Sequence, residues 1–255
     1  MKIVMIGAGN LATHLSEAFI NAGFQIVQVF SRSDISARLL ANRIKAPYTT
    51  DIKSIVIDAS LYVISVNDDA ISQLIEYLPV TKQLVIHTAG SVPMDIFSGK
   101  LDNYGVLYPL QTFSKSRLVN FKEIPIFLEA NNNDNLTALH EIAKSISEKV
   151  YVANSRNRMF LHLAAVFCCN FVNYLYHISS DIVKQDGFNF NILAPLILET
   201  AQKAVESEDP SKVQTGPAIR NDQKTMEKHL NLLDSHNSWH DLYAFLSKSI
   251  RTDQP

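Results

Sequence analysis

The sequence predicts an α/β fold in which a doubly wound, mainly parallel sheet is followed by an all-helical domain. Three observations support this prediction. Short apolar runs alternate with helical patterns over the first 153 residues, a glycine-rich turn follows the first apolar run, and later residues carry helical patterns without strands. Strands that alternate with helices of this length form βαβ units with parallel strands. We therefore expect one domain over residues 1–153 and a second over residues 154–255.

The first domain contains apolar runs of strand length separated by amphipathic patterns. In the first helical pattern Leu11, Leu15 and Phe19 share one face, and Gly23 is its expected stop. Strands are expected at 3–6, 25–30, 61–66, 84–87, 104–107, 124–128 and 150–152, and helices at 10–22, 35–44, 70–78 and 136–146.

The second domain shows long helical patterns at 157–184, 192–206, 222–233 and 240–250. Residues 160–180 include no Asp, Glu, Lys or Arg, and a run of that length could span a bilayer. Polar residues interrupt it, however, and unpaired polar groups are costly in hydrocarbon. We therefore expect no membrane span, but a helix buried in a bundle or in a dimer core.

Composition excludes several classes of protein. Hydrophobic residues make up 47% of the chain, which is enough apolar surface to exclude general disorder. The 23 Lys and Arg are balanced by 25 Asp and Glu, so no basic excess indicates nucleic-acid binding. Cys168 and Cys169 are adjacent and form neither a disulfide framework nor a metal-ligand spacing. These features predict a cytoplasmic protein without a metal site.

The glycine-rich turn between the first strand and the first helix is Gly7-Ala8-Gly9-Asn10-Leu11-Ala12, a G-x-G-x-x-A pattern. In the Rossmann arrangement the first glycine permits the tight turn, and the second lets a pyrophosphate approach the backbone. The helix N-terminus then offers free N–H groups to the phosphates. We expect Gly7, Gly9, Asn10 and Leu11 to bind a dinucleotide; the alternative is a plain tight turn.

The end of the second strand predicts which dinucleotide is bound. NAD sites usually place Asp or Glu there for the ribose 2′-hydroxyl, whereas this chain has Ser31, Arg32 and Ser33. An Arg with hydroxyl neighbours suits a 2′-phosphate, which favours NADP. In the alternative, Arg32 is solvated and Asp34 takes the role of the acid.

Ligands of doubly wound sheets lie outside the carboxyl ends of the strands. Three later strand ends carry polar residues, and Pro109 is suited to aim Tyr108 and Gln111 into the cleft. A core position is the alternative for His87, and Asp69 is expected to cap a helix. We assign Val66, Asn67 and His87 to the cofactor, and Ser91 and Gln111 to the substrate.

The first long helix of the second domain carries a polar stripe. Relative to His162, Asn173 lies at about 20°, His177 at about 60° and Asn170 at about 80° on a regular helix. His162 and His177 would lie about 22 Å apart, so they cannot serve one reaction centre. Hydrogen bonding between helices is the alternative. We expect His162 and Asn170 to be catalytic and Asn173 to bind substrate.

The segment Gln214 to Asp222 is expected to form a loop that enters a helix. Its Arg220 presents a rigid fork suited to a carboxylate of the substrate. An ion pair with Asp222 is the alternative.

Several motifs together resemble one bacterial family. They are the glycine turn, His87-Thr88-Ala89-Gly90-Ser91, Tyr108-Pro109-Leu110-Gln111-Thr112-Phe113, His162-Leu163-Ala164-Ala165-Val166 with Asn170, and Thr215-Gly216-Pro217-Ala218-Ile219-Arg220-Asn221-Asp222. The family consists of proteins described as NADP-dependent oxidoreductases, with a Rossmann-like N-terminal domain and a C-terminal helical domain of unknown function. Its architecture is similar to that of pyrroline-5-carboxylate reductase, 6-phosphogluconate dehydrogenase and prephenate dehydrogenase. The resemblance implies a homodimer formed through the helical domain, with substrate held between the domains.

The resemblance does not transfer a mechanism. Hydroxyisobutyrate-type dehydrogenases have a Lys early in the first long helix, where this chain has His162, and prephenate dehydrogenases have His-Pro where it has Tyr108-Pro109. The sequence thus predicts an NADP(H)-dependent oxidoreductase acting on a small, carboxylate-bearing substrate, with His162 as the proton carrier. A non-catalytic NADP(H) sensor is the alternative, and a purely structural dimerisation module ranks last.

Overall fold

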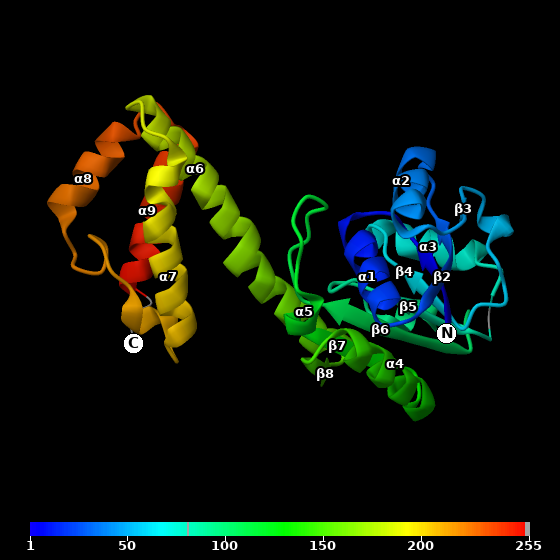
Figure 1. Cartoon of the computed structure of the whole chain (residues 1–255). Helices are drawn as coiled ribbons and strands as arrows, with labels where there is room; N and C mark the ends of the chain where they lie inside the picture. Colours follow the sequence, from blue (N-terminus) through cyan, green and yellow to red (C-terminus); the bar gives the residue numbers. More distant parts are fainter. Residues whose placement is uncertain (81, 253–255) are drawn as a thin grey trace. The chain divides into compact units, whose positions relative to one another are not determined.

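The computed structural model describes residues 1–80 and 82–252, and the chain divides into two compact units (Figure 1). The first unit is Met1–Asn170, and the second begins at Phe171. The first unit holds a mainly parallel sheet with flanking helices, and the second is helical, which confirms the predicted fold class. The domain boundary expected after residue 153 stays a prediction.

The described part of the first unit contains an eight-stranded sheet in the order β3-β2-β1-β4-β5-β6-β7-β8. Neighbouring strands are parallel except β6 and β7, which are antiparallel. The strand order reverses direction at β1 and β4, which is where doubly wound sheets bind ligands. The strands are β1 (Lys2–Ile6), β2 (Gln25–Phe30), β3 (Tyr48–Thr49), β4 (Leu61–Ile64), β5 (Leu84–His87), β6 (Asn103–Pro109), β7 (Ile126–Ala130) and β8 (Val150–Val152).

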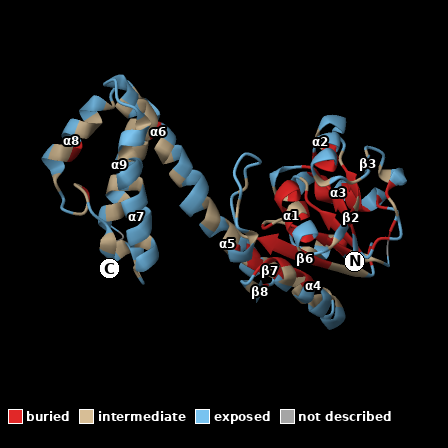
Figure 2. Cartoon of the chain, in the orientation of Figure 1, coloured by how far each residue is buried: buried red, intermediate tan, exposed pale blue. Residues whose placement is uncertain are grey.

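Helices cover both faces of this sheet because the central strands are apolar on both sides. Ile3 and Met5 of β1 pack with α1 (Asn10–Asn21), α2 (Asp34–Ile44) and α4 (Asn133–Ile146). Val4 and Ile6 point to the other face and pack with α3 (Asp68–Tyr77) and the 3₁₀ turn Met94–Phe97. Figure 2 shows the buried residues gathered in the strands and the inner sides of these helices.

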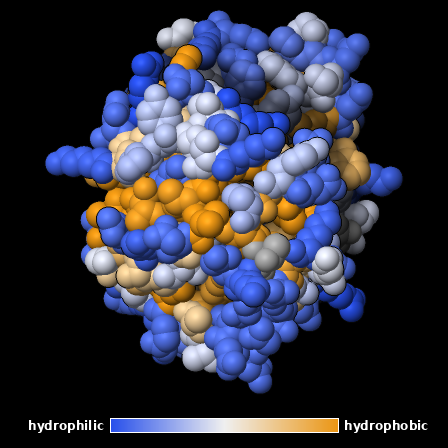
Figure 3. Space-filling model, turned by 90° about the vertical axis from the view of Figure 1, so that its right-hand side faces the viewer, coloured by the Kyte–Doolittle hydropathy of each residue, from blue (hydrophilic) through white to orange (hydrophobic). Residues whose placement is uncertain are grey.

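Figure 3 shows the side that lies to the right in Figure 1; its surface is largely hydrophilic, with hydrophobic side chains in a band across the middle. Folded proteins normally expose much apolar surface, so the band alone assigns no binding function.

One continuous helix, Ser155–Gln185, leads from the first unit into the second. It consists of α5 (Ser155–Ala165), a π-helical segment (Val166–Phe171) and α6 (Val172–Gln185). The buried residues in it are Arg158 and Ile178, so the described chain alone does not bury the helix expected to lie in a bundle or a dimer core, and the dimer core stays a prediction. By length and composition alone, this helix could cross a membrane. The second unit continues with α7 (Ala194–Glu206), α8 (Gln223–Leu232) and α9 (Asn237–Thr252).

Candidate active site

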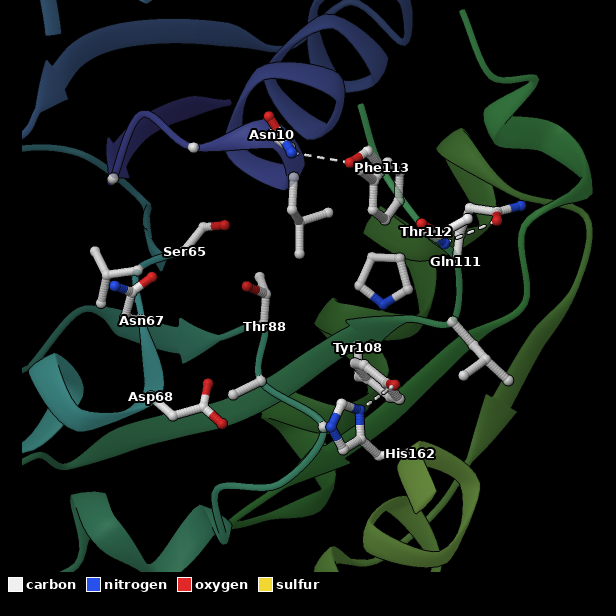
Figure 4. Close-up of a pocket in the computed structure, with 18 of the residues that line it drawn as sticks. Asn10, Ser65, Asn67, Asp68, Thr88, Tyr108, Gln111, Thr112, Phe113 and His162 are labelled. Carbon is white, nitrogen blue, oxygen red and sulfur yellow. Dashed lines mark hydrogen bonds between the residues drawn. The ribbon is translucent and has the colours of Figure 1, made fainter. Parts of the chain in front are cut away.

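A pocket of about 1090 Å³ lies at the carboxyl ends of the central strands, entirely within the first unit. Its walls are the segments that directly follow β1, β2, β4, β5 and β6, together with one side of α5 and the π-helical segment. Figure 4 shows the polar side chains at these strand ends. The topology thus brings together residues that are up to about 160 positions apart in the sequence, as expected for a doubly wound sheet.

The glycine turn forms one end of the pocket. Gly7 has φ +120°, and a Cβ atom there would lie 1.9 Å from the carbonyl oxygen of Ser65, so this position requires glycine. A Cβ on Gly9 would meet no atom within 4 Å, because that position faces open space. Gly9 is also the N-cap of α1, without a side-chain capping bond. The turn therefore leaves room for a group that approaches the backbone at a helix N-terminus.

The segment after β2 lines the same end of the pocket with Ser31, Arg32 and Ser33. The Ser33 hydroxyl caps α2 by accepting from the N–H of Ser36 at 3.3 Å, which fixes the start of that helix. Asp34, the alternative ribose ligand, does not line the pocket and accepts a hydrogen bond from the Tyr48 hydroxyl at 3.2 Å.

Of the residues predicted to line the site from the segments after β4 and β5, some line the pocket and others do not. Val66 and Asn67 line the pocket beside Asp68, which bonds the hydroxyl of Ser91. Ser91 itself is outside the lining. Asp69, the expected cap, lies in the first turn of α3, and the N-cap is Asn67, two residues earlier.

His87 is a core residue, so its assignment to the cofactor is corrected. Its side chain is fully buried, does not line the pocket, and accepts from the N–H of Ala89 through Nδ1 at 3.2 Å. Burial and the nearby charge of Arg158 lower its pKa to about 3, so the imidazole is neutral at pH 7. The sequence does not distinguish the last residue of a buried strand from the first residue of the loop that follows it, and for this reason His87 was assigned to the site.

Tyr108 and His162 meet at the other end of the pocket, and Figure 4 shows their side chains pointing toward one another. The Tyr108 hydroxyl lies 3.2 Å from Nδ1 of His162. A Cβ on Gly90 would lie 2.7 Å from Cζ of Tyr108, so Gly90 makes the space for this pair. Burial raises the pKa of Tyr108 to about 12, and the charge of Asp68 adds to the shift. The phenol is therefore protonated at pH 7 and able to donate to Nδ1 of His162.

A buried ion pair fixes α5, and with it His162, against the loop after β5. The side chain of Arg158 is 1% exposed and pairs with the Glu129 carboxylate of β7. Its guanidinium also donates to the carbonyl of Ala89 at 3.2 Å and to that of Val92 at 2.6 Å. Ser155 donates to Glu129 at 2.7 Å and completes the cluster.

The structure brings together some of the expected substrate residues and not others. Gln111, His162 and Asn170 line the pocket. Asn173 and Arg220 belong to the second unit and are exposed. The π-helical segment between His162 and Asn173 disrupts the regular 3.6-residue period, so the expected single stripe does not hold. Nε2 of His177 instead lies 3.7 Å from the carboxylate of Asp181.

Lys115 and the two cysteines are among the pocket residues that sequence reasoning missed. Lys115 lines the pocket from the segment after β6, and Cys168 and Cys169 line it from the π-helical segment. The lysine could have been found as a cation close behind a strand end. The cysteines had no such signal, because their position depends on the local change of helix type. No group of three or more His, Cys, Asp or Glu suited to a metal ion occurs among the described residues.

Comparison with known proteins defines the family. Residues 1–111 match a Rossmann-like domain, and residues 124–250 match a domain of unknown function, DUF2520. A protein from Bacteroides fragilis, named as a putative NADP oxidoreductase, is 45% identical, with a TM-score of 0.92 over 98% of this chain and 97% of that chain. No curated protein sequence matches the chain.

Two more distant structures share the fold. A 1-pyrroline-5-carboxylate reductase from Streptococcus pyogenes is 13% identical, with a TM-score of 0.67 over 98% of each chain. An imine reductase from Myxococcus stipitatus, in complex with NADP⁺, is 14% identical, with a TM-score of 0.65 over 99% of this chain and 95% of that chain. Because identity to the Bacteroides protein extends over nearly its full length, this chain belongs to the same family, in which a Rossmann-like domain is joined to a DUF2520 domain.

Proposed function

We propose that the protein is an NADP(H)-dependent oxidoreductase that transfers hydride to or from a small substrate. One observation carries this proposal: a single pocket has an open glycine turn at one end and the Tyr108–His162 pair at the other. A sensor would need the turn but no proton-transferring pair. The names of the Bacteroides protein and of the Myxococcus complex support the choice of NADP(H).

The pocket fits the proposed cofactor. The open position at Gly9 admits a pyrophosphate, and backbone N–H groups at Asn10 and Leu11 begin α1 there. Arg32, flanked by Ser31 and Ser33, supplies a charge and two hydroxyls for the 2′-phosphate. The engagement of Asp34 by Tyr48 supports NADP over NAD. When bound, the cofactor would supply or accept the hydride at its nicotinamide ring, and Val66 and Asn67 would line its path.

The protein's own chemical contribution is to hold and move a proton. His162 carries it in this proposal, and the hydroxyl of Tyr108 fixes the orientation of the imidazole through Nδ1. Asn170 and Gln111 would orient the substrate from the pocket wall. Arg158 keeps α5 in place and touches no substrate, so it is a positioning residue.

We retain the prediction that the substrate bears a carboxylate bound by Arg220. Asp222 is the N-cap of α8, and its bonds from Thr225, helped by the charge of Arg220, lower its pKa. Arg220→Gln is expected to raise KM for a carboxylate substrate and to leave kcat nearly unchanged. Equal loss of activity on substrates with and without a carboxylate would contradict this role. Ser91 and Asn173 remain further proposed contacts.

We also propose a homodimer formed through the helical unit. Among the described helices of that unit, α7 and α9 have no buried residue, and Leu198 and Val205, seven positions apart on one face of α7, are both exposed. Apolar helix faces of this kind normally lie against another surface. The polar side chains along Ser155–Gln185 favour protein over lipid as the cover.

We further propose a cytoplasmic location. Cys168 and Cys169 are free thiols, which supports it.

The first test is calorimetric titration of the protein with NADPH and with NADH, repeated on Arg32→Ala. We expect tight NADPH binding that weakens selectively in the variant. Turnover should then be screened with hydroxy acids, keto acids and imines. Binding of neither nucleotide would overturn the proposed function, whereas NADPH binding without turnover of any substrate would favour the sensor.

A further inference from the structure

A short segment after β6 is tied directly to the glycine turn. We call this segment, Phe113, Ser114 and Lys115, the strap. The Asn10 side chain donates to the carbonyl of Phe113 at 2.9 Å, a contact drawn in Figure 4. Nε2 of His14 donates to the carbonyl of Ser114, also at 2.9 Å. Lys115 Nζ donates to the carbonyl of Ala8, in the middle of the turn, at 3.0 Å.

Ring contacts fix the strap further. The Phe113 ring lies 5.5 Å from the ring of the buried His14 and stacks on Phe121 at 6.0 Å, measured between centroids. The strap therefore does not depend on Lys115 for its position. The hydrogen bonds and ring contacts of Phe113 and Ser114 hold Lys115 beside the turn.

Few charged groups share the pocket with this lysine. Among the lining residues that the structure describes, the side chains with a formal charge at pH 7 are Arg32, Asp68 and Lys115. Arg32 follows β2, and Asp68 is engaged with Ser91, so Lys115 is the cation bonded to the turn itself. A bound dinucleotide places its negatively charged pyrophosphate at this turn. Among the described lining residues, Lys115 is the cation that is hydrogen-bonded to the turn.

We propose that Lys115 binds the pyrophosphate of the dinucleotide and that the strap holds it at the turn for this purpose. This inference rests on the proposed function and adds a residue to it. The ammonium now donates to a neutral carbonyl. A phosphate oxygen carries negative charge, so the ammonium gains a Coulombic attraction there that the neutral carbonyl does not provide. The flexible four-carbon stem lets Nζ turn from the Ala8 carbonyl to a phosphate without movement of the strap.

The two cations should therefore have different effects on nucleotide choice. Pyrophosphate is common to NADPH and NADH, so loss of Lys115 should weaken both. The 2′-phosphate exists in NADPH alone, so loss of Arg32 should weaken NADPH more. The ratio of the two affinities separates the role of Lys115 from that of Arg32, and an unchanged thermal midpoint of Lys115→Gln separates nucleotide binding from a merely structural role.

The experiment is calorimetric titration of the full chain with each nucleotide. The variants are Lys115→Gln, Lys115→Arg and Arg32→Ala, with Lys144→Gln as the matched control. Lys144 is an exposed residue of α4 outside the pocket lining, so its loss changes net charge equally. Lys115 is exposed too, so the thermal midpoint of Lys115→Gln should stay that of the wild type.

We expect Lys115→Gln to weaken both nucleotides about tenfold, and Lys115→Arg to recover most of this loss. Lys144→Gln should bind as the wild type does. Unchanged binding of both nucleotides to Lys115→Gln would overturn the inference and leave the proposed function intact. A loss confined to NADPH would also overturn it, because the lysine would then serve the 2′-phosphate. Wild-type protein that binds neither nucleotide would overturn the proposed function itself.

Discussion

The two glycines of the turn differ in what they can tolerate. Gly7 needs a positive φ and lies against the Ser65 carbonyl, whereas Gly9 has φ −78° and faces open space. Gly7→Ala should therefore lower the free energy of unfolding by more than about 1 kcal/mol. Gly9→Ser keeps a good N-cap and should fold normally, but should lose nucleotide affinity. Urea unfolding and nucleotide titration of both variants check this, and equal destabilisation would contradict it.

The contact between Tyr108 and His162 gives a second prediction for single residues. His162→Gln and Tyr108→Phe should each reduce kcat by roughly two orders of magnitude, because the first removes the proton carrier and the second removes the hydroxyl that orients it. NADPH affinity should hardly change. Tyr151→Phe is the matched control, since Tyr151 stacks on Phe127 outside the pocket. Steady-state kinetics with a substrate found in the screen check this prediction. An unchanged kcat in His162→Gln would show that His162 is not the proton carrier.

The buried His87 predicts how stability depends on pH. Its pKa is about 3 in the folded protein and 6.5 in an unfolded chain, so below pH 6.5 the unfolded state binds one more proton. Stability should then fall as pH decreases toward 3, by about 1.4 kcal/mol per pH unit from this residue. Urea unfolding between pH 7 and pH 4 should show a shallower fall for His87→Leu. Parallel curves for the two proteins would contradict the prediction.

At the scale of elements, the Arg158–Glu129 pair joins α5 to β7 and to the loop after β5. Arg158→Met would leave the Glu129 carboxylate without its partner, so we expect a loss of about 3–5 kcal/mol in unfolding free energy. Arg156→Met is the control. Its exposed guanidinium lies 5.8 Å from the centroid of the Phe160 ring, and its loss should cost less than about 1 kcal/mol. Adding Glu129→Gln to Arg158→Met should recover part of the stability, as chemical denaturation can measure.

The sequence predicted elements well where one apolar period ran unbroken. The strands 25–30, 84–87 and 150–152 coincide with β2, β5 and β8. Helices α2, α3 and α4 begin earlier than expected, because the polar residues Ser33, Asn67 and Asn132 serve as N-caps. The two-residue β3 was too short to give a pattern. The π-helical segment was invisible because its apolar residues fit a regular α-helix equally well.

The candidate site was predictable to the extent that it follows strand ends. The turn, Arg32 and Asn67 were placed by the rule that doubly wound sheets bind ligands at carboxyl edges. The exclusion of His87 and the inclusion of Lys115 depend on tertiary contacts with Phe97 and Ala8, which have no local signature. The contact between Tyr108 and His162 joins residues 54 positions apart, so local sequence patterns could not predict it either.

At the scale of the whole molecule, the exposed apolar helices predict the oligomeric state. Leu198 is 69% exposed on α7, so Leu198→Glu should weaken the proposed dimer and leave the fold of the first unit unchanged. Ile35→Glu is the matched control, because Ile35 is similarly exposed on α2 of the first unit, at 65%. Sedimentation velocity over a range of concentrations measures both. A wild-type monomer at every concentration would contradict the dimer, and recovery with membranes would favour lipid as the cover.

The antiparallel pairing of β6 with β7 has a consequence for dividing or recombining this protein. Residues 126–152 complete the sheet, so a chain ended at residue 111 would carry β6 with its outer edge unpaired. Unpaired sheet edges invite association with other chains. Such a fragment would also lack both Glu129 and Arg158, and with them the bonds from Arg158 that fix the loop after β5. A chimera that imports another dinucleotide-binding module should therefore be joined after β8, where the sheet is complete.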